Sequence, residues 1–430
     1  MLDRYNNAQL YKIDSFSGIT IYNLKTEKFK TNTINIFFHD NLTRENASRN
    51  ALLPAVLRRG CSRFPTFRDI SLYLEELYGA TFDCGVTKKG EMQIIQFYID
   101  YVSDRYTGEN SRLFEKAFDL LFEIITSPVL ENGVFKNDYV EQEKDNLRKL
   151  IESRVNDKMQ YSVEKCLEEM CKDEPFGIYD YGSVEELKKI DAKGLYDYYV
   201  TFLQTLPISV YITGNVEESM IDNVIKKLSN IKRGNIKETN TGEVVKEVAE
   251  VRNITETMPV NQSKLSLGFR TNISSSDEDY YALVVYNGIL GGGIHSKLFQ
   301  NVREKESMAY YAFSRLEKFK GLMVISSGIL KENKDKAIRI IEEQLESMRR
   351  GNISEYEFDS TLKTIETGMK SLMDSQLQIV DFYLSQSIVN TNDDFNSFIE
   401  KIKKVTKDDV IRVANKIKLD TIYFLTGTEA

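Results

Sequence analysis

Hydrophobic and polar positions recur with two different periods along the 430-residue chain. A period of two, with apolar residues at every second position, predicts strands that bury one face. A mixed spacing of three and four predicts amphipathic helices. By these patterns we expect strands over residues 34–39, 210–214 and 423–427, and long helices over residues 111–126, 137–158, 334–349 and 354–386.

The pattern occurs twice. INIFFHDNLTRENASRNALLPAV, residues 34–56, lies over LSLGFRTNISSSDEDYYALVVYN, residues 265–287, without a gap. Both segments predict a strand, a polar turn and a helix, and both halves end in a strand closed by Thr-Gly. Such self-similarity indicates duplicated units. We therefore predict an α+β protein with a first half over 1–228, a polar linker over 229–251 and a second half over 252–430.

Composition and charge exclude several classes of protein. The 57 Lys and Arg are interleaved with 65 Asp and Glu, for a net charge of −8, so no basic stripe suits nucleic acid or an anionic membrane surface. No apolar run approaches the roughly 18 to 20 residues of a membrane span, and MLDRYNNAQLYKID lacks a signal pattern. We expect a cytoplasmic protein with no nucleic-acid or membrane partner. Its four cysteines form no C-x-x-C pair, which favours reduced, packed thiols.

One segment of the second half carries a family resemblance. LGGGIHSKLFQNVREKESMAYYAFS, residues 290–314, is similar to L-G-G-G-x-x-S-x-L-F-x-x-x-R-E-K-x-x-x-A-Y-S in the pitrilysin/insulinase zinc metallopeptidases, and departs only at Tyr311. Looser matches, such as LEELYGATFDCGVTKKGE and VEQEKDNLRKLIES, extend it over essentially the whole chain. The resemblance implies two halves, each a mainly antiparallel sheet packed with helices, which face each other across a cleft.

The family's active site lies on the helix after this first strand and turn, as the motif H-x-x-E-H. Two histidines four apart share one helical face and bind zinc, while the Glu deprotonates the metal-bound water. Aligned on Gly60, the motif falls on ALLPAVLRRG, so Ala51, Pro54 and Ala55 stand where the family has His, Glu and His. A proline inside a helix also costs about 3 kcal/mol. The resemblance therefore implies no catalytic residue, no metal site and no cofactor in this chain.

Glu141 or Glu143 falls where the family's third zinc ligand lies, and the alignment leaves open which of them corresponds. Without histidines one carboxylate holds zinc poorly, which favours solvated helix charges. The chain has two histidines, His39 and His295, and neither has a neighbour at ligand spacing. We interpret His39 as a polar strand end, matched by Arg270 in the repeat, and His295 as a surface or groove residue.

Two residues of the second half keep the family's pattern. Arg303 and Tyr310 match the Arg and Tyr that, in catalytic members, reach across the cleft to the substrate backbone and the scissile carbonyl. A phenol can donate to a developing oxyanion, and a guanidinium can bind peptide carbonyls. A salt-bridged Arg beside a core Tyr is the alternative. Gly291, Gly292 and Gly293 lack a phosphate-binding motif, and a tight turn with positive φ explains them.

The resemblance places a substrate-binding edge strand at ATFDCGVT, with the expected contacts at Thr81, Phe82, Asp83 and Cys84. Peptides add to such edges through main-chain hydrogen bonds, which tolerate changed side chains. The family's Asn, Ala and Thr correspond to Phe82, Asp83 and Gly85, so an altered preference or no use of this edge stays open. No histidine is placed to activate Cys84 as a nucleophile.

These observations support three hypotheses. The first is a pseudo-peptidase that pairs with a homologous subunit bearing H-x-x-E-H and zinc, binds peptides or unfolded segments, and supplies Arg303 and Tyr310 in trans. The second is a peptide-binding or scaffold protein with no peptidase role. The third, a stand-alone peptidase, would need the two distant histidines to combine with unrecognised carboxylates.

Overall fold

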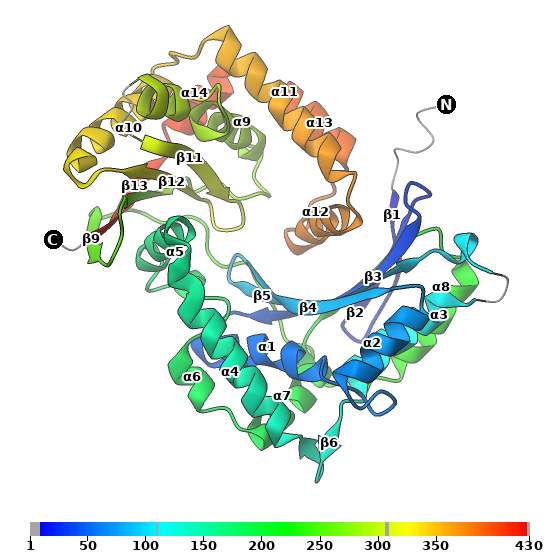
Figure 1. Ribbon diagram of the computed structural model, residues 1–430. Helices are drawn as coiled ribbons and strands as arrows, with labels where there is room; N and C mark the ends of the chain where they lie inside the picture. The colour runs from blue at the N-terminus through cyan, green and yellow to red at the C-terminus, as the bar shows by residue number, and fades with distance from the viewer. Residues whose placement is uncertain (1–8, 109–110, 306–308, 428–430) are drawn as a thin grey trace. The chain divides into compact units, whose positions relative to one another are not determined.

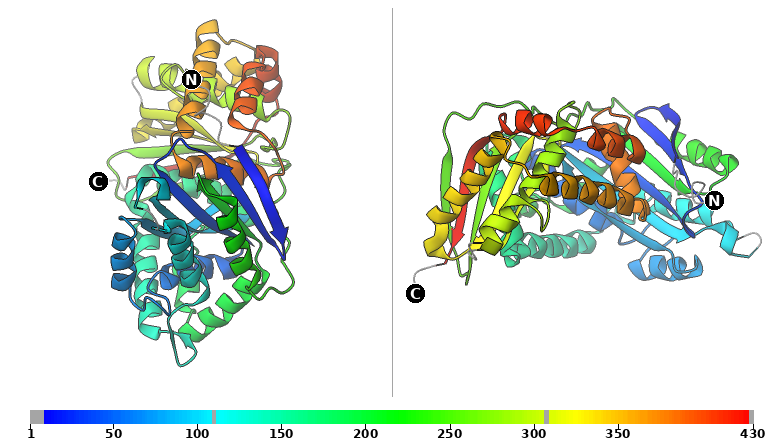
Figure 2. Two further views of the ribbon diagram at one scale, coloured as in Figure 1. Left: turned by 90° about the vertical axis from the view of Figure 1, so that its right-hand side faces the viewer. Right: turned by 90° about the horizontal axis from the view of Figure 1, so that it is seen from above.

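A computed structural model describes residues 9–108, 111–305 and 309–427. The chain divides into two compact units, one formed by Met1–Ser153 with Ile178–Asn240 and the other by Arg154–Gly177 with Thr241–Ala430. The first unit differs from the half predicted over 1–228 because residues 154–177 cluster with the second unit. Each unit is an α+β assembly with one main sheet (Figures 1 and 2).

The first unit is built on a six-stranded sheet in the order β1-β2-β8-β3-β5-β4 (Figure 1). The central strand β3 pairs antiparallel with β5 on one side and with β8 on the other, and β4 forms one edge. The bounds are β1 (Gln9–Phe16), β2 (Ile19–Lys25), β3 (Thr31–Asn41), β4 (Thr81–Lys89), β5 (Met92–Val102) and β8 (Ile208–Gly214), with a separate hairpin of β6 (Leu130–Glu131) and β7 (Val134–Phe135).

The second unit has a five-stranded sheet in the order β11-β12-β10-β13-β9. Its central β10 is flanked by antiparallel β12 and β13, and β9 runs parallel to β13 as β2 runs parallel to β8. Apart from β1, the two sheets share one order, which confirms the duplicated α+β plan. The bounds are β9 (Arg252–Thr257), β10 (Ser263–Arg270), β11 (Ala309–Glu317), β12 (Leu322–Ile329) and β13 (Lys418–Thr426).

Helices cover the apolar face of the first sheet. Residues 32–40 of β3 are all buried. Ile36 and Phe38, which lie on one face of the strand, share a core with Leu52 of α1 and Phe118 of α3. The helices of this unit are α1 (Arg44–Leu57), α2 (Phe67–Glu76), η2 (Asp104–Tyr106), α3 (Leu113–Thr126), α4 (Asn137–Ser153), α6 (Val184–Lys188), α7 (Ala192–Thr205) and α8 (Glu218–Ser229).

In the second unit, α9 packs against β11, and α5 packs against β10, β12 and β13. Helices α12 and α13 meet through the stacked rings of Phe382 and Phe395. The helices of this unit are η3 (Arg154–Asn156), α5 (Lys158–Met170), η4 (Pro175–Gly177), α9 (Tyr280–Gly291), the π-helix η5 (Phe299–Lys305), η6 (Lys331–Asn333), α10 (Lys334–Arg349), α11 (Glu355–Leu372), α12 (Gln376–Ile388), α13 (Phe395–Lys403) and α14 (Lys407–Ala414).

Two of the long helices predicted from the pattern are interrupted. The helix predicted over 137–158 ends at Ser153, and α5 starts anew with Asp157 as its N-cap. The helix predicted over 354–386 divides into α11 and α12, and Ser375 caps the second by accepting from the backbone N–H of Gln378. Asp and Ser satisfy free N–H groups at a helix start, so these caps favour the breaks.

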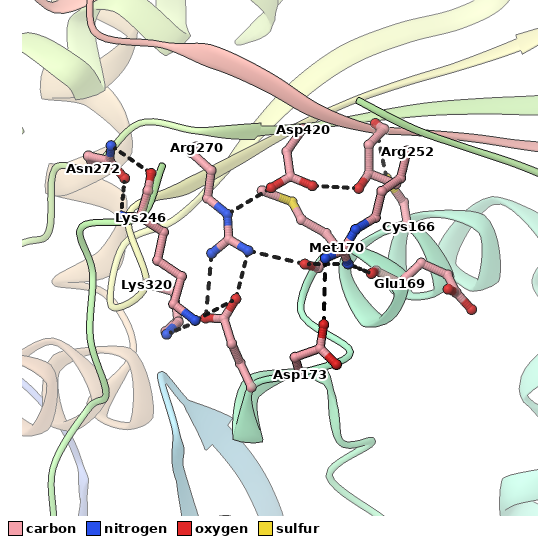
Figure 3. Close-up of polar contacts among 12 residues, drawn as sticks. Cys166, Glu169, Met170, Asp173, Lys246, Arg252, Arg270, Asn272, Lys320 and Asp420 are labelled. Carbon is pink, nitrogen blue, oxygen red and sulfur yellow. Dashed lines mark hydrogen bonds and ion pairs between the residues drawn. The ribbon is translucent and has the colours of Figure 1, made fainter. Parts of the chain in front are cut away.

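A buried charge cluster ties the segment 154–177 to the second sheet. Glu174 accepts from Arg270 at 2.7 Å and is paired with Lys320 at 2.8 Å and Lys246 at 3.3 Å. Arg270 also pairs with Asp420 on β13 at 3.1 Å (Figure 3). Since buried charges must be paired, the cluster fixes this segment against β10 and β13.

The predicted linker has neither helix nor strand between α8 and β9. Its two ends are nevertheless bound to different units. Arg233 donates to the carbonyl of Ser17 and to those of Leu203 and Leu206 in the first unit. The backbone of Lys246 exchanges hydrogen bonds with the side chain of Asn272 in the second.

Candidate functional site

Helix α1 holds the three positions that correspond to the zinc motif. Thr43 caps the helix by accepting from the backbone N–H of Asn46, and the helix continues through Pro54 to Leu57. Ala51 and Pro54 are buried. A methyl group and a pyrrolidine ring offer no lone pair to a metal, so this helix supplies packing and no ligand.

After α1 the backbone at Gly60 passes very close to the backbone of Pro65. A Cβ atom built there would lie 2.4 Å from the carbonyl oxygen of Pro65. Only glycine permits this close approach of two backbone segments. Arg58, the C-cap of α1, and Arg59 lie between the end of the helix and this glycine.

Strand β4 lies at the edge of the first sheet, pairs with β5 and packs against α1. Thr81 and Asp83 are exposed, whereas Phe82 and Cys84 pack against the core. The edge predicted from the resemblance is thus an edge in the structure. Whether a peptide uses it stays a prediction.

Cys84 is a hydrogen-bond donor in this arrangement. Its thiol donates to the carbonyl oxygen of Pro54, with a sulfur–oxygen distance of 3.2 Å. Burial raises the pKa of the Cys84 thiol to about 12, which leaves it protonated and unreactive near neutral pH. The other cysteines, Cys61, Cys166 and Cys171, are buried, and all four are free thiols.

The two candidate carboxylates on α4 have different environments. Glu141 is exposed and pairs with Lys144 at 2.9 Å. Glu143 is 4% exposed and lies 2.7 Å from Nε of Arg59, and its second oxygen accepts from Asn146 at 3.2 Å. The prediction of solvated helix charges therefore fits Glu141 but is wrong for Glu143, which is buried and pairs with Arg59 beyond the end of α1.

The residues present do not fit a zinc ion. Ala51, Pro54 and Ala55 donate nothing, and Glu143 already has a guanidinium partner. Across the three described stretches of chain, no three His, Cys, Asp or Glu side chains gather in a way that could hold a metal. No step of chemistry in this chain is assigned to a metal.

Both histidines are buried and neutral. His39 on β3 makes a 2.9 Å hydrogen bond to the hydroxyl of Ser209, and burial lowers its pKa to about 4. His295 makes a 2.9 Å hydrogen bond to Thr361, and burial lowers its pKa as well. The prediction of a surface or groove position for His295 is wrong, because its ring packs toward α11.

Arg303 and Tyr310 lie at the surface of the second unit. Arg303 is in η5, with its side chain 42% exposed, its guanidinium 4.6 Å from the ring centre of Phe299 and 3.7 Å from Glu304. Tyr310, on the edge strand β11, is 71% exposed. Tyr310 is therefore not a core residue, and the ion pair of Arg303 with Glu304 is exposed and weak.

The glycine triplet serves close packing. A Cβ on Gly291 would lie 2.4 Å from the backbone nitrogen of Ser314 on β11. None of Gly291, Gly292 and Gly293 has a positive φ, so the predicted reason for the triplet is wrong. Close approach of α9 to β11 explains Gly291, and a Cβ on Gly292 would lie 2.7 Å from Cα of Gly288 in α9.

Comparison with known proteins identifies the family. The pattern described as "Peptidase M16 inactive domain" matches residues 189–365, and a relative from Bacillus subtilis (strain 168) is 37% identical over 415 residues, which is 96% of each chain. The chain therefore belongs to the pitrilysin/insulinase family of metallopeptidases, known as M16, as a non-catalytic member without H-x-x-E-H. That relative is the "Probable inactive metalloprotease YmfF".

Two further comparisons are informative. "Uncharacterized zinc protease YmxG", also from Bacillus subtilis (strain 168), is 24% identical over 243 residues, 56% of each chain. The crystal structure of a conserved protein from Enterococcus faecalis V583 matches with a TM-score of 0.90 and 30% identity, over 97% of this chain and 99% of that one. Among the described residues, no helix has the length and apolar character needed to cross a bilayer.

Sequence reasoning missed Arg59. It precedes the anchoring glycine in ALLPAVLRRG, and its three partners on α4 are Tyr139, Gln142 and Glu143. Their spacing of three and four places them on one helical face. The spacing indicates that the three side chains can contact one common partner. It does not show that this partner is Arg59, because only the fold places α4 beside the end of α1.

Proposed function

We propose that this chain is the non-catalytic subunit of a two-chain zinc metallopeptidase. The observation that carries the proposal is a contrast between the two halves. The positions of the zinc motif on α1 hold Ala51, Pro54 and Ala55, while Arg303 and Tyr310 remain and are exposed. If Arg303 and Tyr310 contact a substrate, the metal for its hydrolysis must come from a partner, because this chain offers no zinc ligands at the motif positions.

The chemistry of Arg303 and Tyr310 suits peptide hydrolysis. The Tyr310 hydroxyl can donate to the oxyanion that forms when water attacks a peptide carbonyl. The Arg303 guanidinium can donate to backbone carbonyls of an extended peptide. Both side chains would act on a substrate whose scissile bond lies at the partner's zinc.

The edge strand β4 supports binding of an extended peptide. Strand addition needs a free row of backbone N–H and C=O groups, which an edge strand provides. Thr81 and Asp83 point away from the core, while Phe82 and Cys84 anchor the strand. The substrates in this proposal are peptides or unfolded segments of polypeptides.

The proposed partner is a homologous subunit with an intact H-x-x-E-H motif. One bacterium carries both a relative named as a probable inactive metalloprotease and one named as a zinc protease, which supports such a pairing. In this proposal zinc belongs to the partner and not to this chain, and the complex acts in the cytoplasm without nucleic acid or membrane.

A pull-down of the chain from its native cell tests the pairing. The proposal expects a homologue bearing H-x-x-E-H in equal amount, with one zinc per complex. It also expects no bound zinc in the isolated, tag-free chain. Recovery of the chain alone and free of zinc would contradict the proposal and favour a peptide-binding or scaffold role.

A further inference from the structure

The linker between α8 and β9 is bound to the protein along much of its length. Its first part, residues 231–240, lies on the first unit and is called the first arm. The backbone N–H of Gly234 donates to the carbonyl of Gln204 at 2.9 Å. The side chain of Ile236 lies over Gly18, which has a φ of +74° and where a Cβ atom would be only 2.7 Å away. The first arm is therefore packed on the first unit.

The second arm, residues 243–247, lies on the second unit in a similar way. The buried side chain of Lys320 donates to the carbonyl of Glu243 at 2.6 Å. The side chain of Val244 lies over Gly321, which has a φ of +58° and where a Cβ atom would also be 2.7 Å away. In both units, a glycine without a side chain makes room for an aliphatic residue of the linker.

An asparagine holds each arm, and the two asparagines are counterparts in the repeat, because residues 34–56 aligned with 265–287 match Asn41 with Asn272. Asn41 donates to the carbonyl of Glu238 at 2.9 Å and accepts from the backbone N–H of Asn240 at 3.2 Å. Asn272 accepts from the N–H of Lys246 at 3.0 Å and donates to its carbonyl at 3.2 Å (Figure 3). Each amide thus uses its donor and its acceptor on the linker backbone.

Thr241 and Gly242 lie between the two arms. The division between the units falls between Asn240 and Thr241, and Gly242 has a φ of +87°, which glycine adopts without strain. We infer that the linker consists of two bound arms, each a fixed part of one unit, and that Thr241 and Gly242 form the joint at which this connection can bend. The inference does not depend on the proposed function.

Limited proteolysis tests whether the arms are bound. Trypsin cleaves after Lys237 in the first arm and after Lys246 in the second, and each lysine is followed by Glu. Cleavage requires local unfolding, so its rate follows the population of the opened segment. Each site in the native chain should be cut at least about a hundredfold more slowly than in a free peptide of residues 229–251. A smaller difference at either site would overturn the inference.

Two variants test whether each asparagine holds its own arm. Asn41→Ala should raise the rate of cleavage after Lys237 about tenfold and leave that after Lys246 unchanged, because it removes two hydrogen bonds from the first arm alone. Asn272→Gly should have the reverse effect. Glycine is chosen there because Asn272 has a φ of 55°.

Two other asparagines are matched controls. Asn253→Ala removes an exposed side chain on β9 that donates to Val251 at 3.4 Å, and Asn390→Gly changes another residue with positive φ, at 54°. Neither should alter cleavage in the arms. If Asn41→Ala or Asn272→Gly accelerates cleavage at both sites or at neither, the assignment of one asparagine to each arm is wrong.

An insertion locates the joint. Tolerance of an insertion depends on the hydrogen bonding and burial of the backbone that it interrupts. Gly-Ser-Gly-Ser between Ile236 and Lys237 separates two bound parts of the first arm. It should therefore lower the melting temperature by at least about 2 °C more than the same insertion between Thr241 and Gly242. Equal melting temperatures of the two chains would overturn the inference.

Discussion

Glu174 is the residue at which buried charge matters most in the second unit. Its side chain is 5% exposed and pairs with Arg270 and Lys320. Burial alone would oppose its ionisation, but the hydrogen bonds from these two cations outweigh burial and lower the pKa of Glu174 to about 2. The ordinary value is 4.5, so ionised Glu174 stabilises the folded state.

Glu174→Gln should lower the free energy of unfolding by about 3 kcal/mol at pH 7, because Arg270 and Lys320 lose the charge that compensates them. Urea unfolding measures the change. Asp173→Asn is the matched control: Asp173 is exposed and pairs with Arg252 at 3.6 Å, so its loss should cost at most about 1 kcal/mol. Equal effects of the two changes would contradict the role assigned to Glu174.

The lowered pKa of Glu174 also predicts that the stability of the folded chain depends on pH. A carboxylate whose pKa is lowered on folding contributes stability above its unfolded pKa and loses it as the pH falls toward the folded value. The contribution of Glu174 is therefore complete above about pH 5 and declines between pH 4.5 and about 2. In this window the parent chain should lose stability more steeply than Glu174→Gln.

At the scale of elements, the edge strand β4 allows a direct test of peptide binding. Neighbouring residues of an antiparallel strand point their N–H groups alternately toward the paired strand and away from it. Gly85→Pro and Val86→Pro each remove one N–H, so one variant should weaken the pairing with β5 and the other should affect only the free edge.

The variant that keeps the parent melting temperature should bind an unfolded peptide at least about tenfold more weakly, by fluorescence anisotropy, because strand addition relies on main-chain hydrogen bonds. Gly85 leaves room for the change, since a Cβ there meets no atom within 4 Å. Unchanged affinity in the stable variant would show that peptides do not add to β4.

The elements also show what could be predicted from sequence. The repeat of residues 34–56 in 265–287 predicted two related sheets, and β3 and β10 are indeed their central strands. The helix over 334–349 was predicted with its full bounds. The breaks before α5 and α12 were missed because apolar spacing continues across them, whereas the caps Asp157 and Ser375 depend on local hydrogen bonds.

The sequence predicted those features of the site that depend only on which residue type stands at an aligned position. Ala51, Pro54 and Ala55 reveal the missing ligands without a structure. The burial of His295 and the choice between Glu141 and Glu143 could not be predicted, because both depend on which helices pack together. The contacts of Arg59 with α4 could not be predicted either, because only the fold places α4 beside the end of α1.

At the scale of the whole molecule, the chain is a non-catalytic member of its family. Arg303 and Tyr310 nevertheless match the Arg and Tyr of the family's pattern. If these two residues act on a substrate held by a zinc-bearing partner, they affect catalysis although this chain has no active site. Loss of one oxyanion donor typically lowers kcat by about a hundredfold or more. The account therefore predicts a large kinetic effect from residues outside the zinc-bearing subunit.

The most direct test is the steady-state kinetics of peptide cleavage by the purified complex with Arg303→Ala or Tyr310→Phe in this chain. Arg315→Ala, on the same strand as Tyr310, and Tyr356→Phe on α11 are matched exposed controls. The account predicts that Tyr310→Phe lowers kcat by about a hundredfold and Arg303→Ala lowers kcat/KM, with complex assembly unchanged and both controls near the parent. Parent-like kcat and kcat/KM in both variants would contradict it.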